Sequence, residues 1–160
     1  MPRYKTAIFL FLILSSFVFS AMSQNCNGFH AEYCKPYDDK TYNEYGKSRS
    51  ALMIVNIPSY ARIVFYGGKD YKLIFCTKDN KYPVHYIIKN IENNEVLYDN
   101  IIDDYIESVG FTVDKTQSFL IEMTVISDEK TDFENIEHRL CLGLQILWRK
   151  VGDLGFEKQP

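Results

Sequence analysis

The sequence lacks the short motifs by which hydrolases are usually recognised. No serine or cysteine stands in the G-x-S-x-G pattern that forms a nucleophile elbow. Histidine is scarce, and neither His85 in a predicted strand nor His138 after a charged loop indicates a catalytic pair. Cys26, His30 and Cys34 are spaced as metal ligands on a helix would be, but a fourth ligand is missing. We therefore expect a protein that is not an enzyme and needs no cofactor.

Positive charge is also in short supply. Arg3 and Lys5 are the only charged residues before position 24, so residues 24–160 carry 16 basic and 21 acidic side chains, a net charge of −5. A negative balance disfavours nucleic acid and anionic membranes as partners. The main apolar run, 7–19, is shorter than the roughly 20 residues of a membrane-spanning helix. We expect no transmembrane segment in the mature chain.

Residues 1–23 instead have the layout of a secretory signal peptide. The short basic start is followed by the apolar run and then by Ala21-Met22-Ser23, a small-x-small pattern that a signal peptidase accepts. The mature chain is predicted to begin at Gln24. It would work outside the cytoplasm, in the periplasm or at the outer envelope, with the extracellular space as the alternative.

All four cysteines lie in the mature chain, and their number is even. In an exported protein this predicts two disulfides, for which three connectivities exist. Cys76 and Cys141 alternate with apolar residues, so we expect both on the outer faces of their strands. Our hypothesis joins these two across neighbouring strands and joins Cys26 to Cys34 within the N-terminal segment.

Eight short runs, most with alternating apolar residues, predict an all-β fold. They span 52–57, 60–66, 71–76, 84–90, 95–98, 108–113, 117–126 and 138–148. Such runs, separated by turns, are typical of an antiparallel β-sandwich or jelly roll. The strongest hairpin signal joins 60–66 to 71–76 through Gly67-Gly68-Lys69-Asp70. We expect a sandwich at 51–150, preceded by an irregular tyrosine-rich arm at 24–50 and followed by a tail at 151–160.

An acidic cluster follows the predicted strand at 95–98. It consists of Asp99, Asp103, Asp104 and Glu107. Calcium takes six to eight oxygen ligands and often draws them from such loops, but the spacing does not match an EF-hand. A solvated acidic loop is the interpretation we prefer, with calcium as the alternative.

Tyrosine is the most suggestive residue type on the predicted surface. Tyr37, Tyr42 and Tyr45 lie in the arm, where no predicted strand explains them, so they are candidate docking residues. Arg49 follows them and is expected to pin the arm to the sandwich through a buried ion pair. Candidate sugar-stacking rings are Tyr98, Tyr105 and Trp148.

Two segments resemble a group of small secreted disulfide-containing β-sandwich proteins of Bacteroidota. They are Ser-Arg-Ser-Ala-Leu at 48–52 and Gly-Lys-Asp-Tyr at 68–71, and the positions of the cysteines fit the same layout. More loosely, the strand order resembles the β-sandwich modules appended to secreted peptidases, of the pre-peptidase C-terminal kind. The resemblance implies a secreted sandwich and carries over no catalytic residue.

Two functions from different classes follow as expectations. The first is a non-catalytic structural or interaction protein, a subunit that docks onto a larger assembly of envelope proteins. The second is a carbohydrate-binding module, with or without calcium, that holds a glycan on exposed rings. The first is favoured because the sequence carries no sign of catalysis and has an aromatic arm.

Overall fold

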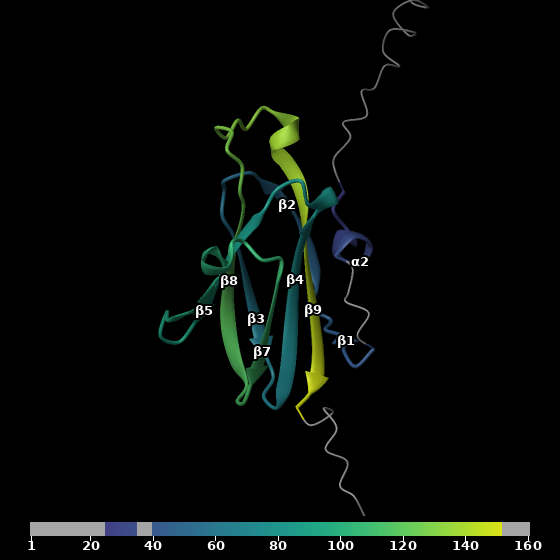
Figure 1. Ribbon diagram of the computed structural model, residues 1–160, viewed down its shortest axis with the longest axis vertical. Helices are drawn as coiled ribbons and strands as arrows, with labels where there is room; N and C mark the ends of the chain where they lie inside the picture. The colour runs from purple at the N-terminus through teal and green to yellow at the C-terminus, as the bar shows by residue number, and fades with distance from the viewer. Residues whose placement is uncertain (1–24, 35–39, 152–160) are drawn as a thin grey trace, which may run out of the picture.

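The chain folds as an antiparallel β-sandwich, as the sequence predicts. The structure is a computed structural model that describes residues 25–34 and 40–151 (Figure 1). The strands in this part of the chain are β1(Asn43–Glu44), β2(Arg49–Ile54), β3(Ser59–Phe65), β4(Lys69–Thr77), β5(Val84–Asn90), β6(Val96–Asp99), β7(Ser108–Val113), β8(Gln117–Val125) and β9(Arg139–Lys150). Each of the eight predicted runs corresponds to one of them, and β1 is the addition. Short helices are α2(Phe29–Tyr33), η1(Lys78–Asn80), η2(Asn100–Asp103) and η3(Ile136–His138).

The strands form two sheets that face each other. The five-stranded sheet has the order β1-β9-β4-β7, and β2 pairs with β9 on the same side as β1. The four-stranded sheet has the order β3-β8-β5-β6. Strand β9 pairs with β4 along one edge and with β1 and β2 along the other, so it is the centre of its sheet (Figure 1).

The core lies between the sheets and follows the alternation of the sequence. Along β8 every second side chain is buried, from Phe119 to Val125, while Glu122 and Thr124 face outward. Along β9 the expected apolar face, Leu142, Leu144 and Ile146, is buried against the other sheet. Full burial of each such side chain stabilises the fold by roughly 1.5–3 kcal/mol. Alternation therefore determines which face of each strand turns inward.

The predicted hairpin between 60–66 and 71–76 is wrong. Strand β3 pairs with β8, whereas β4 pairs with β7 and β9, so the turn at Gly67-Gly68 carries the chain from one sheet to the other. The two strands therefore pack face to face, and the ring centroids of Phe65 and Tyr71 lie 4.8 Å apart. A turn sequence indicates a reversal of direction, but it does not decide whether the next strand pairs or packs.

The predicted disulfide pairing is also wrong. The bonds join Cys26 to Cys141 and Cys34 to Cys76, with Cα separations of 5.4 and 5.2 Å. Cys76 and Cys141 do lie on the outer face of neighbouring strands, but each binds one end of the segment that contains α2. That segment crosses the outer face of β9, a non-local contact that the sequence pattern does not contain (Figure 1).

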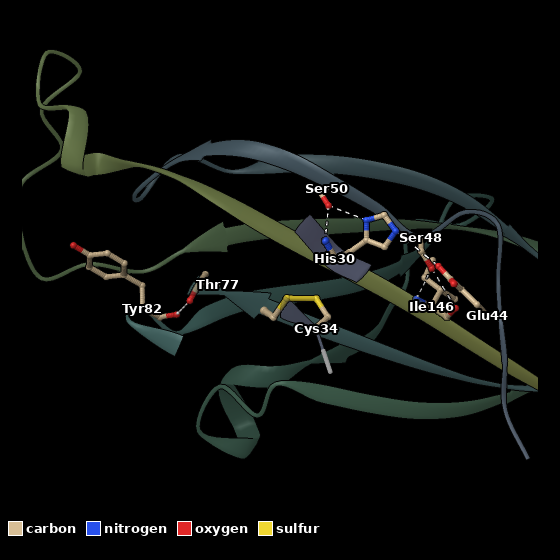
Figure 2. Close-up of a disulfide and its surroundings, with 9 residues drawn as sticks. His30, Cys34, Glu44, Ser48, Ser50, Thr77, Tyr82 and Ile146 are labelled. Atoms are coloured by element: carbon tan, nitrogen blue, oxygen red, sulfur yellow. Dashed lines mark hydrogen bonds and ion pairs between the residues drawn. A yellow bond between two sulfur atoms is a disulfide. The ribbon is translucent and has the colours of Figure 1, made fainter. Parts of the chain in front are cut away.

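The N-terminal arm is therefore part of the sandwich rather than an irregular extension. Helix α2 buries Phe29 against Ile74 and Leu147, which form a second, smaller apolar cluster outside the main core. His30 fixes the helix to β2, because both its backbone N–H and its Nδ1 lie 2.8 Å from the Ser50 hydroxyl oxygen (Figure 2). The Nε2 atom of His30 faces a Glu44 carboxylate oxygen at 3.8 Å.

Gly143 is the point on β9 over which α2 and the Cys34–Cys76 disulfide lie. A Cβ atom at this position would lie 2.6 Å from the sulfur of Cys34, 2.8 Å from that of Cys76 and 2.9 Å from the Cα of His30. No real side chain fits in that space, because the obstructing atoms belong to a disulfide and to backbone. The close approach of helix to sheet requires glycine here.

The pairing can be tested by mass spectrometry of a non-reduced digest of the exported protein. We expect one linked peptide pair that contains Cys26 and Cys141 and another that contains Cys34 and Cys76. In the chain-entropy model, loops of 115 and 42 residues contribute about 4–5 kcal/mol each when taken separately. A peptide that links Cys26 to Cys34 would contradict the fold of the arm.

Gly143→Ala tests the contact between helix and sheet. We expect the free energy of unfolding to fall by about 2–3 kcal/mol, because the methyl group forces α2 and the Cys34–Cys76 disulfide away from β9. The measurement is urea unfolding followed by fluorescence. Gly46→Ala is the matched control, because a Cβ there meets nothing within 4 Å. Equal stability of the two variants would refute the requirement for glycine at position 143.

Candidate functional site

One lateral side of the sandwich is open. Strands β6 and β7 are the edge strands there, and neither pairs with a second strand among the described residues. Between them lies a cavity of about 420 Å³ that is open to solvent. Its walls are mainly apolar and come from both sheets: Ile88, Leu97, Tyr98, Val109, Phe111 and Phe119. A mostly apolar concavity of this size is typical of a binding site.

The opposite lateral side is closed by an aromatic ring. Tyr45, between β1 and β2, donates a hydrogen bond of 2.7 Å from its hydroxyl to the Val64 carbonyl on the edge of β3. Its ring also packs against Phe65 and Tyr71. The two sides therefore differ: a side chain bridges the sheets on one, whereas a cavity separates them on the other.

Residues 100–107 connect the two edges of the opening, from β6 to β7, and we call this segment the crossover. Aliphatic side chains are exposed on β6 and along the crossover: Val96, Leu97, Ile101, Ile102 and Ile106. Ile102 keeps 74% of its surface accessible and Leu97 keeps 44%. Such exposure of large apolar side chains beside a cavity is typical of an interaction surface.

Asn100 holds the crossover in place. It is fully buried, and its Oδ1 accepts a hydrogen bond of 2.8 Å from the Tyr86 backbone N–H. Its Nδ2 donates to the carbonyls of Val84 and Ile106, at 2.8 and 3.2 Å. The side chain thus satisfies backbone groups of β5 beyond the end of the short strand β6. It also links them to the residue that leads toward β7.

Two acidic residues of this region, Asp99 and Asp103, make local contacts. Asp99 caps η2 by accepting from the Ile101 N–H, and its Oδ1 lies 2.8 Å from His85 Nε2. Asp103 accepts a hydrogen bond of 2.6 Å from the Tyr98 hydroxyl at the cavity wall. Asp104 adopts a left-handed backbone conformation after the helix. Within 25–34 and 40–151, no group of three or more His, Cys, Asp and Glu side chains could hold a metal ion.

Tyr98 of the cavity wall has a second tyrosine, Tyr86, as its neighbour, with the ring centroids 5.9 Å apart. Burial raises the pKa of Tyr98 to about 12, and the hydrogen bond to Asp103 adds to the effect. Burial also raises the pKa of Tyr86, whose ring is fully enclosed and packs against that of Tyr98. The Tyr86 hydroxyl makes no hydrogen bond of good geometry with the residues that the structure describes. Both phenols therefore remain neutral over the ordinary pH range.

The three candidate sugar-stacking rings are not brought together. Tyr98 lies at the cavity wall, and Tyr105 packs the edge of its ring against His85 at 5.9 Å. Trp148 lies on β9, two strands away from β7, and the Lys69 ammonium covers its ring at 3.9 Å. A shared stacking platform would need these rings on one face.

The arm residues are placed against the sandwich. Tyr42 carries the Arg149 guanidinium over its ring at 4.5 Å, and Tyr45 bridges the sheets as described above. Both rings thus anchor the arm to the sandwich. Arg49 is exposed and donates to the Lys47 carbonyl, so the expected buried ion pair is wrong. Tyr37 lies outside the described residues.

The arrangement nearest to a catalytic triad is Ser50, His30 and Glu44 on the outer face of the large sheet (Figure 2). The Ser50 hydroxyl also accepts a hydrogen bond from the backbone N–H of His30. Ser50 therefore attaches α2 to β2. His138 is held similarly: its Nδ1 accepts from the Asp132 N–H at 3.0 Å and its Nε2 faces Glu129 at 3.0 Å. Each of these contacts ties a loop or helix to the fold.

Comparison with protein-family models finds none that matches this chain, and comparison with curated proteins finds no match. In the described part of the chain, no helix has both the length and the apolar character needed to cross a membrane.

The cavity between β6 and β7 was not anticipated from the sequence. The available signal was the group of aliphatic residues at 96–106 that do not alternate as a half-buried strand would.

Asn100→Ala tests the anchor of the crossover. We expect the free energy of unfolding to fall by about 2–4 kcal/mol, because the Tyr86 N–H and the Val84 carbonyl lose a buried partner. Urea unfolding gives the value. Asn93→Ala, in an exposed turn, is the control and should change the stability by about 0.5 kcal/mol or less. A loss no larger than that of the control would show that the Asn100 side chain does not hold the crossover.

Tyr98→Phe tests the raised pKa of the Tyr98 phenol. The Tyr98 phenol has a pKa of 10 in the unfolded chain, the ordinary value for tyrosine, and about 12 in the folded chain. Between these two pH values the unfolded chain has released the Tyr98 proton, whereas the folded chain keeps it. The folded state thus loses stability as the pH rises through this window. We expect Tyr98→Phe to reduce the slope of unfolding free energy against pH there. The exposed Tyr60→Phe should leave the slope unchanged, and equal slopes in all three proteins would disprove the shift.

Proposed function

We propose that this protein is an exported, non-catalytic interaction module that binds an extended segment of another cell-envelope protein at the opening between β6 and β7. One observation carries the proposal: two strand edges that have no second partner among the described residues flank an apolar cavity, and the segment that joins them exposes aliphatic side chains. Edges of this kind recruit further strands.

An extended polypeptide matches the opening in two ways. Its backbone offers hydrogen-bond donors and acceptors to an edge strand, and its alternate side chains point to one side, as in β-strand addition. The cavity is lined by four consecutive residues of β7, 109–112, which span about 10 Å along the strand. Two side chains at positions i and i+2 of an added strand would enter a cavity of that length.

Export is supported by two independent features. The described part of the chain holds two disulfides and no free cysteine, which suits an oxidising compartment. Residues 1–23 have the pattern of a signal peptide. The envelope as the place of action is carried by the resemblance to secreted proteins of Bacteroidota. A carbohydrate-binding module has less support, because the candidate rings lie apart.

The proposal is tested by photo-crosslinking in the native host. A photoreactive amino acid replaces Ile102 at the opening in one tagged copy of the full chain and Leu52 in another. Leu52 is the matched control, because it is 50% exposed and lies on β2, at the opposite edge of the sheet that contains β7. We expect position 102, and not position 52, to crosslink to one segment of one envelope protein, identified by sequencing the linked peptide.

The same experiment with Leu97→Asp should lower the yield of that crosslink about tenfold or more, because a charge at the cavity wall opposes burial of apolar side chains. Leu52→Asp should not change the yield, and both variants should unfold at a similar urea concentration. Equal crosslinking from positions 52 and 102, or no crosslink from position 102, would refute the proposal.

A further inference from the structure

The charge around the opening constrains what can enter it. Residues 95–107, which form β6 and the crossover, contain five carboxylates and no lysine, arginine or histidine. No lysine or arginine occurs anywhere between Lys89 and Lys115. An occupant of the cavity therefore meets a negative potential at the crossover end, and cationic groups there are attracted over about 10 Å at physiological salt.

Part of this charge remains uncompensated. Asp99 faces His85 and Asp103 accepts the Tyr98 hydroxyl, but Asp104 and Glu107 form no ion pair with any described residue. Asp103 accepts a hydrogen bond from Tyr98, a residue of the cavity wall, so one carboxylate of the crossover lies in contact with that wall. Asp104 and Glu107 both lie on the crossover, the segment that also exposes aliphatic side chains.

These features argue against two other occupants. A second copy of this chain carries a net charge of −5 over residues 24–160, and an acidic crossover would face a partner of the same sign. A lipid would fill the cavity but could not pair with the backbone groups along the edges of β6 and β7 as an added strand does. A polypeptide uses both the cavity and the edges.

Resting on the proposed function, we infer that the bound segment is an extended peptide with apolar residues at alternate positions and lysine or arginine at the end beside the crossover. The apolar residues enter the cavity between the sheets, as the spacing of two residues along a strand requires. The basic end lies against Asp104 on the crossover, where charge complementarity sets the register and orientation of the peptide.

The test is selection from a random nonapeptide library displayed on phage. The oxidised mature protein is the bait, and Leu97→Asp combined with Ile102→Asp is the bait for counter-selection. We expect the enriched peptides to alternate apolar and polar residues and to carry a net positive charge concentrated at one end. They should not bind the counter-selection variant.

Affinities of the selected peptides then test the charge itself. We expect Asp104→Asn to weaken binding about threefold at low salt, and the difference to shrink at 1 M salt. Asparagine tolerates the left-handed backbone of position 104. The matched control neutralises one exposed carboxylate of another loop, Asp128→Asn, and should leave the affinity unchanged.

The outcomes separate this inference from the function on which it rests. Peptides that require the opening but lack basic residues would overturn the inference and leave the proposed function intact. No enrichment of peptides that depend on Leu97 and Ile102 would overturn both. Self-association abolished by Ile102→Asp, or a lipid retained in native mass spectrometry, would assign the opening to a second copy or to lipid instead.

Discussion

The backbone pairing of strand β9 is the constraint on which the rest of the structure depends. It carries β1 and β2 on one edge and β4 on the other, so most of the larger sheet is assembled around it. Its inner face contributes to the core, and its outer face receives α2. Gly143 allows both at once, because only a residue without a side chain lets the helix and the Cys34–Cys76 disulfide rest on the strand. The N-terminal segment is thereby part of the fold.

The two lateral sides of the sandwich are finished differently, and the difference defines the site. Tyr45 bridges the sheets on one side through its hydroxyl and its ring. On the other, β6 is only four residues long, and Asn100 takes over the hydrogen bonds that a longer strand would have made. The chain thus leaves a cavity and two strand edges where it could have closed the sandwich. Edges are normally protected, because open ones invite association; here aliphatic side chains and carboxylates surround them.

The strands themselves could be predicted from the sequence, whereas their partners could not. Alternation over 117–126 and 138–148 identified β8 and β9 and the faces that they bury. The same reasoning placed Cys76 and Cys141 correctly on outer faces. It failed for the hairpin at Gly67-Gly68 and for the disulfides, because pairing partners are chosen by contacts between residues far apart in the chain. The candidate site depends on the same contacts: its walls come from β5, β6, β7 and β8.

By itself, the sequence determined the class of the fold, the inward face of the clearly alternating strands, the pattern of an export signal and the even set of cysteines, because each follows from neighbouring residues or from a count of residues. Only the tertiary structure decided that α2 covers β9, that Cys26 joins Cys141, that Tyr42 and Tyr45 anchor the arm, and that the side between β6 and β7 stays open. The physical reason is that local periodicity directs a side chain to one face of its strand. Which surface that face meets is set by the packing of distant segments against one another.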